Sequence, residues 1–249
     1  MKYSTPGVLV AALVLANLAL AQQEPAPVIN IKVSRSVKTV TYRAKGGETK
    51  VDFQGTALQP RAEGVAKVES KQGRIAIHAE FEKLEPAIRL GDVYLTYVLW
   101  AISPEGAVTN LGEIVLDGGK GKITVTAPLQ AFAMIVTAEP YFAVSFPSEL
   151  VVLENIVRSD TVGKVDSVDA KFELLQRGQY EAGRFEPFNF DSNTPLDLYQ
   201  ARNAVRIARS QQADRYAEDS FTKAEKALRQ AEDYHQRKDR KSTRLNSSH

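Results

Sequence analysis

Three glutamates lie close together in the chain and could carry acid–base chemistry. Glu80, Glu82 and Glu85 form an acidic cluster, and glycosidases use paired carboxylates to cleave a glycosidic bond. However, residues two apart on a strand share one face of the sheet, so Glu80 and Glu82 also fit a solvated, charged strand surface. We expect this cluster to be surface, and we name no catalytic residue.

The other candidate residues do not complete a catalytic or metal-binding set. His78 and His235 fall in different modules of the chain, and the alternation around His78 predicts that it faces solvent. Asp92 and Glu139 fall at strand ends, where loop oxygens could hold Ca²⁺, but no Asp-x-Asp-x-Asp-Gly loop supports such a site. We therefore expect no metal.

Two further absences argue against an enzyme. The chain contains no cysteine, which excludes disulfides, thiolate zinc sites and a cysteine nucleophile. It also lacks a Gly-x-Ser-x-Gly elbow, a phosphate-binding glycine loop and a His-Glu-x-x-His motif. We predict a protein that is not an enzyme and that needs no cofactor.

Composition is that of an ordinary globular protein. The 249 residues are 43% hydrophobic and 25% charged, which is enough for one good core and a second, smaller module. The formal net charge is +2, so no excess of positive charge points to nucleic acid. We expect no nucleic-acid partner.

The N-terminus has the pattern of a secretory signal peptide, residues 1–21. Lys2 supplies a short positive region, and the almost wholly apolar run Gly7–Leu20 follows it. Small residues before the cut predict cleavage between Ala21 and Gln22, with an uncleaved anchor as the alternative. The proline-bearing stretch 22–27 is then a tether, and the mature chain has no transmembrane span. These features predict a protein exported to the periplasm, or associated with the outer membrane, of a bacterium.

Residues 28–158 show short β-prone runs separated by turns. Between Arg74 and Glu82, apolar and polar residues alternate, as in a strand with one buried face. Ser103–Gly106 and Asp117–Lys120 have the composition of tight turns between antiparallel strands. No helical crossovers separate the runs, so we predict an antiparallel, Ig-like β-sandwich.

The densest apolar run after the signal is Gly91–Gly112, and it contains the only tryptophan, Trp100. Both faces of this run are mostly apolar, which predicts a central strand covered on both sides. We therefore expect Trp100 to be a core anchor and not part of a binding surface.

Residues 159–194 are predicted to connect the sandwich to a helical part. Val168, Phe172 and Leu175 recur at helical spacing after a possible cap, which predicts a short helix near 167–177. The aromatic stretch that follows, 184–193, is expected to pack on the sandwich; an exposed ligand platform at 185–190 is the alternative.

From residue 195 to 238 the pattern becomes helical. An interruption at Gln211–Asp219 predicts two helices that form a hairpin, or else one kinked helix. The fold expected for the whole chain is thus mainly β, with an α-helical C-terminal part. The expected helix-packing residues are Leu198, Ala201, Val205, Ala208, Phe221, Ala224, Leu228 and Ala231.

The helical part carries a family resemblance. The stretch AVRIARSQQADRYAEDSFTKAEKALRQAED, Ala204–Asp233, resembles the alanine-rich helical domain of unknown function of bacterial envelope proteins. In that family the domain often precedes an OmpA-like peptidoglycan-binding domain. The resemblance implies that the helical region binds an envelope protein or a peptidoglycan-associated partner.

The last eleven residues are expected to have a different origin from the rest of the chain. Asp239–His249, DRKSTRLNSSH, resembles the in-frame translation of a common sequencing adapter. We therefore expect the helical region to be truncated after Lys238, and we exclude this segment from fold reasoning.

These observations favour a non-catalytic, exported cell-envelope protein with a structural or binding role. The alternative is a carbohydrate- or peptide-binding β-sandwich module that uses loops at one end of the sandwich and the aromatics at 185–190. An envelope hydrolase is the third hypothesis, and it depends on the acidic cluster.

Overall fold

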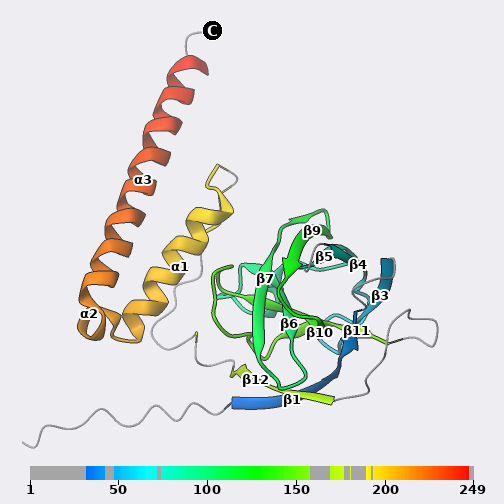
Figure 1. Cartoon of the computed structure of the whole chain (residues 1–249). Helices are drawn as coiled ribbons and strands as arrows, with labels where there is room; N and C mark the ends of the chain where they lie inside the picture. Colours follow the sequence, from blue (N-terminus) through cyan, green and yellow to red (C-terminus); the bar gives the residue numbers. More distant parts are fainter. Residues whose placement is uncertain are drawn as a thin grey trace, which may run out of the picture.

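Antiparallel strands form the first part of the molecule, and helices complete it (Figure 1). The computed structural model describes residues 32–42, 48–71, 74–157, 169–176, 180, 189–191 and 193–246. The elements are β1 Lys32–Lys38, β2 Val40–Thr41, β3 Glu48–Gly55, β4 Glu63–Lys71, β5 Arg74–Glu82, the 3₁₀ helix η1 Ala87–Leu90, β6 Thr96–Ile102, β7 Val108–Ile114, β8 Leu116–Asp117, β9 Lys120–Ala127, β10 Ala131–Glu139, β11 Val151–Ile156, β12 Asp169–Leu175, α1 Leu196–Ser210, α2 Ala213–Tyr216 and α3 Glu218–Asn246.

The described strands form one large sheet and one small one. The large sheet has ten strands in the order β7-β6-β10-β11-β3-β4-β5-β9-β8, and β2 pairs with β10 beside this path. Its two end strands, β7 and β8, are separated in sequence by Val115 alone, so the curved sheet nearly closes on itself. The predicted architecture, mainly antiparallel β with a C-terminal helical part, is confirmed.

Burial along two strands follows the sequence pattern. On β5, Ile75, Ile77, Ala79 and Phe81 are buried while His78 is exposed, as the alternation predicts. Every residue of β6 is buried, so this strand is covered on both faces. Trp100 lies at its middle with no exposed surface, and it belongs to the main hydrophobic core.

Glycines permit both tight turns. Gly106 has φ +87°, and its amide donates to the carbonyl of Ser103 at 2.9 Å. At the β8–β9 hairpin, Gly118 and Gly119 have φ +57° and +82°, the conformation required at both central positions of a type I′ turn. A Cβ on Gly119 would lie 3.1 Å from the carbonyl oxygen of Leu84, so this turn also packs closely against the segment after β5.

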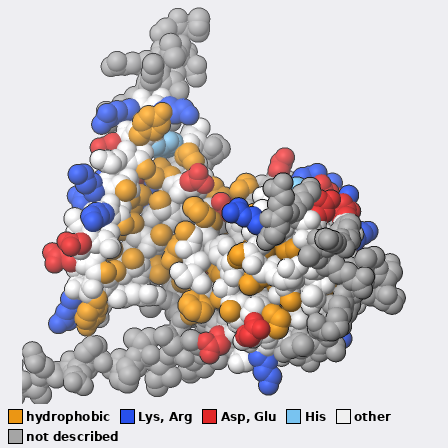
Figure 2. Space-filling model, in the orientation of Figure 1, with side chains coloured by type: hydrophobic (Ala, Val, Ile, Leu, Met, Phe, Trp, Pro, Cys, Tyr) orange, Lys and Arg blue, Asp and Glu red, His pale blue; other side chains and the backbone are white. Residues whose placement is uncertain are grey.

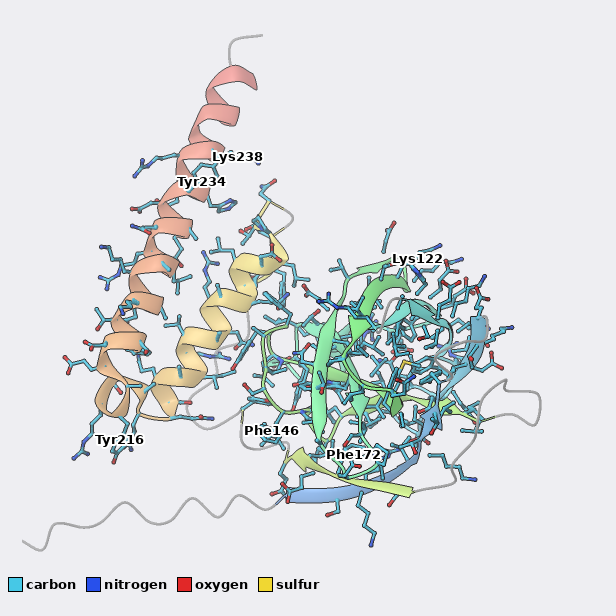
Figure 3. All side chains as sticks on the ribbon, viewed as in Figure 1. Lys122, Phe146, Phe172, Tyr216, Tyr234 and Lys238 are labelled. Atoms are coloured by element: carbon cyan, nitrogen blue, oxygen red, sulfur yellow. The ribbon has the colours of Figure 1, made fainter. Side chains whose placement is uncertain are left out.

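One predicted element is wrong. The helix expected near 167–177 is instead strand β12, which pairs antiparallel with β1 across Lys38↔Asp169 to Lys32↔Leu175. Ala170, Phe172 and Leu174 are buried and the residues between them are exposed, which is a two-residue period. Phe172 lies at the base of the β-domain (Figure 3). The helical spacing of Val168, Phe172 and Leu175 was coincidental, because the edge of β1 supplies a strand partner.

The helices form a hairpin, with α1 and α3 side by side and α2 at the turn (Figure 1). Two ion pairs link them: Arg202 Nε lies 3.0 Å from Glu232 Oε1, and Arg209 pairs with Glu225. The later residue of α1, Arg209, pairs with the earlier residue of α3, Glu225, so the two helices run antiparallel. Tyr216 lies at the turn of the hairpin and Tyr234 far along α3, and both are exposed (Figure 3).

The predicted helix-packing stripe is buried only in part. Leu198 and Phe221 are buried, whereas the other residues on the α1 side are half-buried: Ala201, Val205 and Ala208. On α3 Leu228 is half-buried, but Ala224 and Ala231 are exposed. Glu225 and Glu232 turn toward α1 instead, since they pair with its arginines, and the two alanines lie to one side of the contact.

Several predictions fall outside the described residues. These are the signal peptide with its cleavage at Ala21 and Gln22, the tether 22–27, and the aromatics Phe185 and Phe188. Among the described residues, no helix combines the length and the apolar character needed to cross a membrane.

Candidate ligand-binding cleft

The candidate site lies where the large sheet splits between β6 and the β7–β8 strand. β6 and β7 stay paired as far as Tyr97 and Ile114, and no ladder pair is described beyond that point. After Val115 the chain pairs with β9 instead, with Leu116 opposite Gly121. A wedge therefore opens between the beginning of β6 and β8.

A cleft of about 630 Å³ occupies this wedge, a size typical of small-molecule sites. The β5–η1 segment and the β8–β9 turn close it on one side, and Phe190 and Leu196 line it from the approach to α1. Most of its lining is aliphatic: Leu84, Ile88, Leu95, Ile114, Val115 and Leu116. Val115, at the kink, is 59% exposed.

The polar groups of the lining already have partners inside the protein. The hydroxyl of Tyr97 donates to the carbonyl of Glu85 at 2.6 Å and accepts from Nε2 of Gln59 at 2.6 Å. The amide of Glu85 in turn donates to Oε1 of Gln59 at 3.0 Å. Burial raises the pKa of Tyr97 above its usual value, so this hydroxyl stays protonated. The network positions the cleft wall, and it uses the single donor of the tyrosine hydroxyl.

A second network links the cleft to the first helix. Thr96, another lining residue, donates through its hydroxyl to Oε1 of Glu113 at 2.6 Å. The same carboxylate oxygen accepts from Nε2 of Gln200 on α1 at 2.6 Å. Gln200 also accepts from the amide of Phe142 at 2.7 Å. The helix is therefore tied to the strands that form the cleft.

Asn203 is the central contact between α1 and the β-domain. It is fully buried, and its amide nitrogen donates to the carbonyls of Val93 at 2.8 Å and Pro140 at 2.9 Å. Ile207, one turn further along, joins the main hydrophobic core. Asn203 and Ile207 lie on the face of α1 opposite Val205, so α1 contacts the β-domain with one face and α3 with the other.

One charged side chain, that of Glu85, belongs to the lining of the cleft. Arg61 lies 3.3 Å from the carboxylate of Glu85, and its side chain is 83% exposed. Arg89 is an exposed residue of η1, next to the lining residue Ile88.

The predicted acidic cluster is a charged surface, as expected from strand geometry. Glu80 pairs with Lys122 at 2.8 Å and Glu82 with Lys120 at 3.1 Å, across β5 and β9. The hydrogen bond from Lys122 and its charge hold the pKa of Glu80 below its usual value. Figure 2 shows acidic and basic side chains gathered over this part of the β-domain, where Figure 3 labels Lys122. These carboxylates are arranged for ion pairing and not as a catalytic dyad.

The two histidines remain separate. The ring of exposed His78 lies 3.1 Å from the hydroxyl of Thr124 on β9. His235 lies on α3, with its Nε2 3.5 Å from the hydroxyl of Thr194. They belong to different parts of the molecule, as predicted.

The two acids considered for Ca²⁺ have different environments. Asp92 is exposed, whereas Glu139, the last residue of β10, has no exposed surface. Oε1 of Glu139 accepts from the hydroxyl of Thr137 at 2.5 Å and from the amide of Ser148 at 2.7 Å. Burial raises the pKa of Glu139 to about 8, although these hydrogen bonds oppose the shift. In the part of the chain that is described, no group of three or more potential metal ligands occurs.

Sequence reasoning did not find the cleft or the contacts of α1. Leu84–Ile88 has no regular period, and Val115 looks like one more residue of a continuous strand, although it marks the kink. One available signal was the spacing of Gln200, Asn203 and Ile207, which form a second helical stripe opposite the apolar one. Side-chain amides in such a stripe indicate that this face of the helix forms hydrogen bonds with the backbone of a neighbouring element.

No family model, curated protein or solved structure matches this chain.

Proposed function

We propose that this chain is a non-catalytic, exported protein of the bacterial cell envelope that binds an apolar ligand in the cleft between β6 and β8. The observation that carries the proposal is the lining of the cleft. Its walls are aliphatic, and the hydroxyls of Tyr97 and Thr96 already donate within the protein. Such a surface suits burial of an apolar group, and the one carboxylate in the lining, that of Glu85, is paired with Arg61.

The proposed location is the periplasm or the outer membrane, and it rests on the sequence pattern of residues 1–21. The helical hairpin is proposed to contact an envelope protein or a peptidoglycan-associated partner. Its support is the resemblance of Ala204–Asp233 together with the exposed outer side of α3, which includes Tyr234. Because Asn203 and Gln200 tie α1 to the β-domain, a partner held by the hairpin would lie near the cleft.

Two measurements test this function. In a bacterial host, a tagged full-length chain should appear in the periplasmic or outer-membrane fraction, shortened by its first 21 residues. An uncleaved chain in the cytoplasm would refute export. The purified chain should also enhance the fluorescence of an apolar probe such as anilinonaphthalene sulfonate, and Val115→Glu should remove most of that signal. Val115 is the change of choice because its side chain is exposed at the mouth of the cleft, where it carries little of the core packing.

A second candidate is the binding of an extended peptide. The observation in its favour is the end of the β6–β7 ladder at Tyr97 and Ile114, which leaves the beginning of β6 without a described neighbour on that side. A peptide could add a strand there. A screen of an envelope-peptide library with the wild-type chain and Val115→Glu would detect it. The carbohydrate alternative depends on the aromatics at 185–190. Of these, Phe190 alone lies among the described residues, and its side chain lines the cleft.

A further inference from the structure

We propose that Glu139 is a pH-sensitive latch: its neutral carboxyl keeps the β10–β11 loop, residues 140–150, closed, and the closed loop holds helix α1 on the β-domain. When the carboxyl ionises, the loop opens and α1 separates. Figure 3 labels Phe146 in this loop, on the side of the β-domain nearest the hairpin. Three observations carry the inference: the burial of the carboxyl, its bonds to the loop, and the bonds of the loop to α1. It does not depend on what the cleft binds.

The carboxyl of Glu139 is completely buried, and it forms no ion pair with a described residue. Its Oε1 accepts from the hydroxyl of Thr137 and the amide of Ser148, whereas its buried Oε2 has no hydrogen-bond partner in the described part of the chain. A negative charge at this place would lose its hydration without compensation, so burial raises the pKa to about 8. Ionisation is therefore favoured only when water reaches the carboxyl.

The titratable groups near this carboxyl are tyrosines. Burial, and then the nearby charge of Glu139, raises the pKa of both Tyr141 and Tyr180 above the usual value, so these two phenols stay neutral while Glu139 titrates. Tyr94 packs edge-on against Tyr180, with 6.5 Å between the ring centroids. A phenol carries no positive charge, so these neighbours do not stabilise the ionised carboxylate as an ion pair would.

The loop is closed by its bonds to the end of β10. Ser148 is fully buried; its amide donates to Oε1 of Glu139 at 2.7 Å, and its hydroxyl donates to the carbonyl of Ala138 at 2.7 Å. These contacts join residues nine and ten positions apart, so they fold the loop back on the strand. Displacement of Ser148 would let water reach the carboxyl, and it would open the loop at the same time.

The same loop holds α1 through two hydrogen bonds. Asn203 of α1 donates to the carbonyl of Pro140 at 2.9 Å. The amide of Phe142 donates to Oε1 of Gln200, also on α1, at 2.7 Å. Both loop residues follow Glu139 within three positions. Opening of the loop would therefore remove two of the contacts that dock the helix.

The direction of the pH response follows from the two pKa values of Glu139. The carboxyl has its ordinary pKa of about 4.5 when hydrated in the open state, and about 8 in the closed state. The closed state is thus most favoured below pH ~4.5. Between these values the opening equilibrium should rise by at most about tenfold per pH unit, because one proton is released. Above pH ~8 both states are ionised, and the equilibrium should level off.

Amide hydrogen exchange of the full-length chain between pH 5.5 and 8 tests the latch, with each rate divided by that of an unstructured peptide at the same pH. Protection of Ser148 and of the α1 amides should fall severalfold per pH unit, and it should stay below that of β6. In Glu139→Gln, which remains neutral, this fall should be absent. The matched control is Glu149→Gln, which removes a half-buried carboxyl from the same loop and should behave like the wild type.

The emission of Trp100, the only tryptophan, provides a second readout. Its indole donates to Thr137, whose hydroxyl donates to the carboxyl of Glu139. Emission of the wild type should therefore change with a midpoint near pH 8, and emission of Glu139→Gln should not. Circular dichroism would confirm that both variants are folded.

Four outcomes would overturn the latch. The first needs no variant: protection of α1 in the wild type does not change between pH 5.5 and 8. In the second, Ser148 responds to pH but α1 does not, so Glu139 controls the loop alone. In the third, α1 and β6 are equally protected at every pH, so α1 is released only by global unfolding. In the fourth, the response persists in Glu139→Gln, so another group carries it. None of these results bears on export or on binding of the apolar probe, which test the proposed function separately.

Discussion

The indole Nε1 of Trp100 on β6 donates a hydrogen bond to the hydroxyl of Thr137 on β10, at 2.8 Å. That hydroxyl donates in turn to the carboxyl of Glu139 at 2.5 Å, which also accepts from the amide of Ser148 at 2.7 Å. All four residues are buried. A polar chain therefore runs through the core from the central strand to the loop that leads into β11.

Trp100→Ala should destabilise the fold by roughly 3–5 kcal/mol, because it removes a large, fully buried aromatic from the centre of the core. Trp100→Phe keeps most of the volume but removes the donor to Thr137, so we expect a smaller loss of about 1–3 kcal/mol. Urea denaturation monitored by circular dichroism measures both. An unchanged melting temperature for the alanine variant would mean that Trp100 is not a core residue.

Glu139 should make stability depend on pH. Its folded pKa of about 8 lies above the value of about 4.5 expected in the unfolded chain, so the folded state holds its proton more tightly. The contribution of this group is then fully present below pH ~4.5, and it is lost as pH rises through about 8.

The free energy of unfolding, measured in urea between pH 5 and 9, should therefore fall with rising pH. In Glu139→Gln, which keeps the shape and removes the titration, that part of the slope should vanish. A wild-type slope of the opposite sign, or one retained in the glutamine variant, would contradict this account.

Asn203→Ala should loosen α1 from the β-domain. The change leaves the buried carbonyls of Val93 and Pro140 without their donor, at a cost of about 1–3 kcal/mol for each unsatisfied group. Faster amide hydrogen exchange in α1 than in β6 would report local undocking. Gln230→Ala, which removes an exposed amide from α3, is the control and should change neither stability nor exchange. Equal protection of α1 in the wild type and Asn203→Ala would refute the anchoring role.

Gly106→Ala should disturb β12. The residue has φ +87°, and a Cβ there would lie 2.0 Å from the carbonyl oxygen of Lys171, so backbone would have to move. We expect a loss of about 1–3 kcal/mol, the usual cost of a strained backbone position. Gly118→Ala is the matched control, since it also has positive φ but no atom within 4 Å of the added Cβ. If the two variants lose equal stability, the contact with β12 contributes nothing.

Local pattern was sufficient to predict much of the fold. The alternation on β5 placed Ile75, Ile77, Ala79 and Phe81 inside, and the apolar composition of both faces of β6 predicted its full burial. The two turns and the change to a helical period were also readable. The same approach was wrong at 167–177, because the burial of Ala170, Phe172 and Leu174 depends on β1, more than a hundred residues earlier in the chain.

The sequence by itself determined most of the strands, turns and helices, with β12 as the exception, because steric preference and side-chain period act over a few residues. The tertiary structure decided which strands meet and what lies between them. The kink at Val115 opens the sheet into a cleft, the carbonyls of Val93 and Pro140 give Asn203 its role, and burial changes the chemistry of Glu139. These features arise from contacts between distant parts of the chain. The free energies of these contacts depend on the exclusion of water, which is complete only in the folded protein.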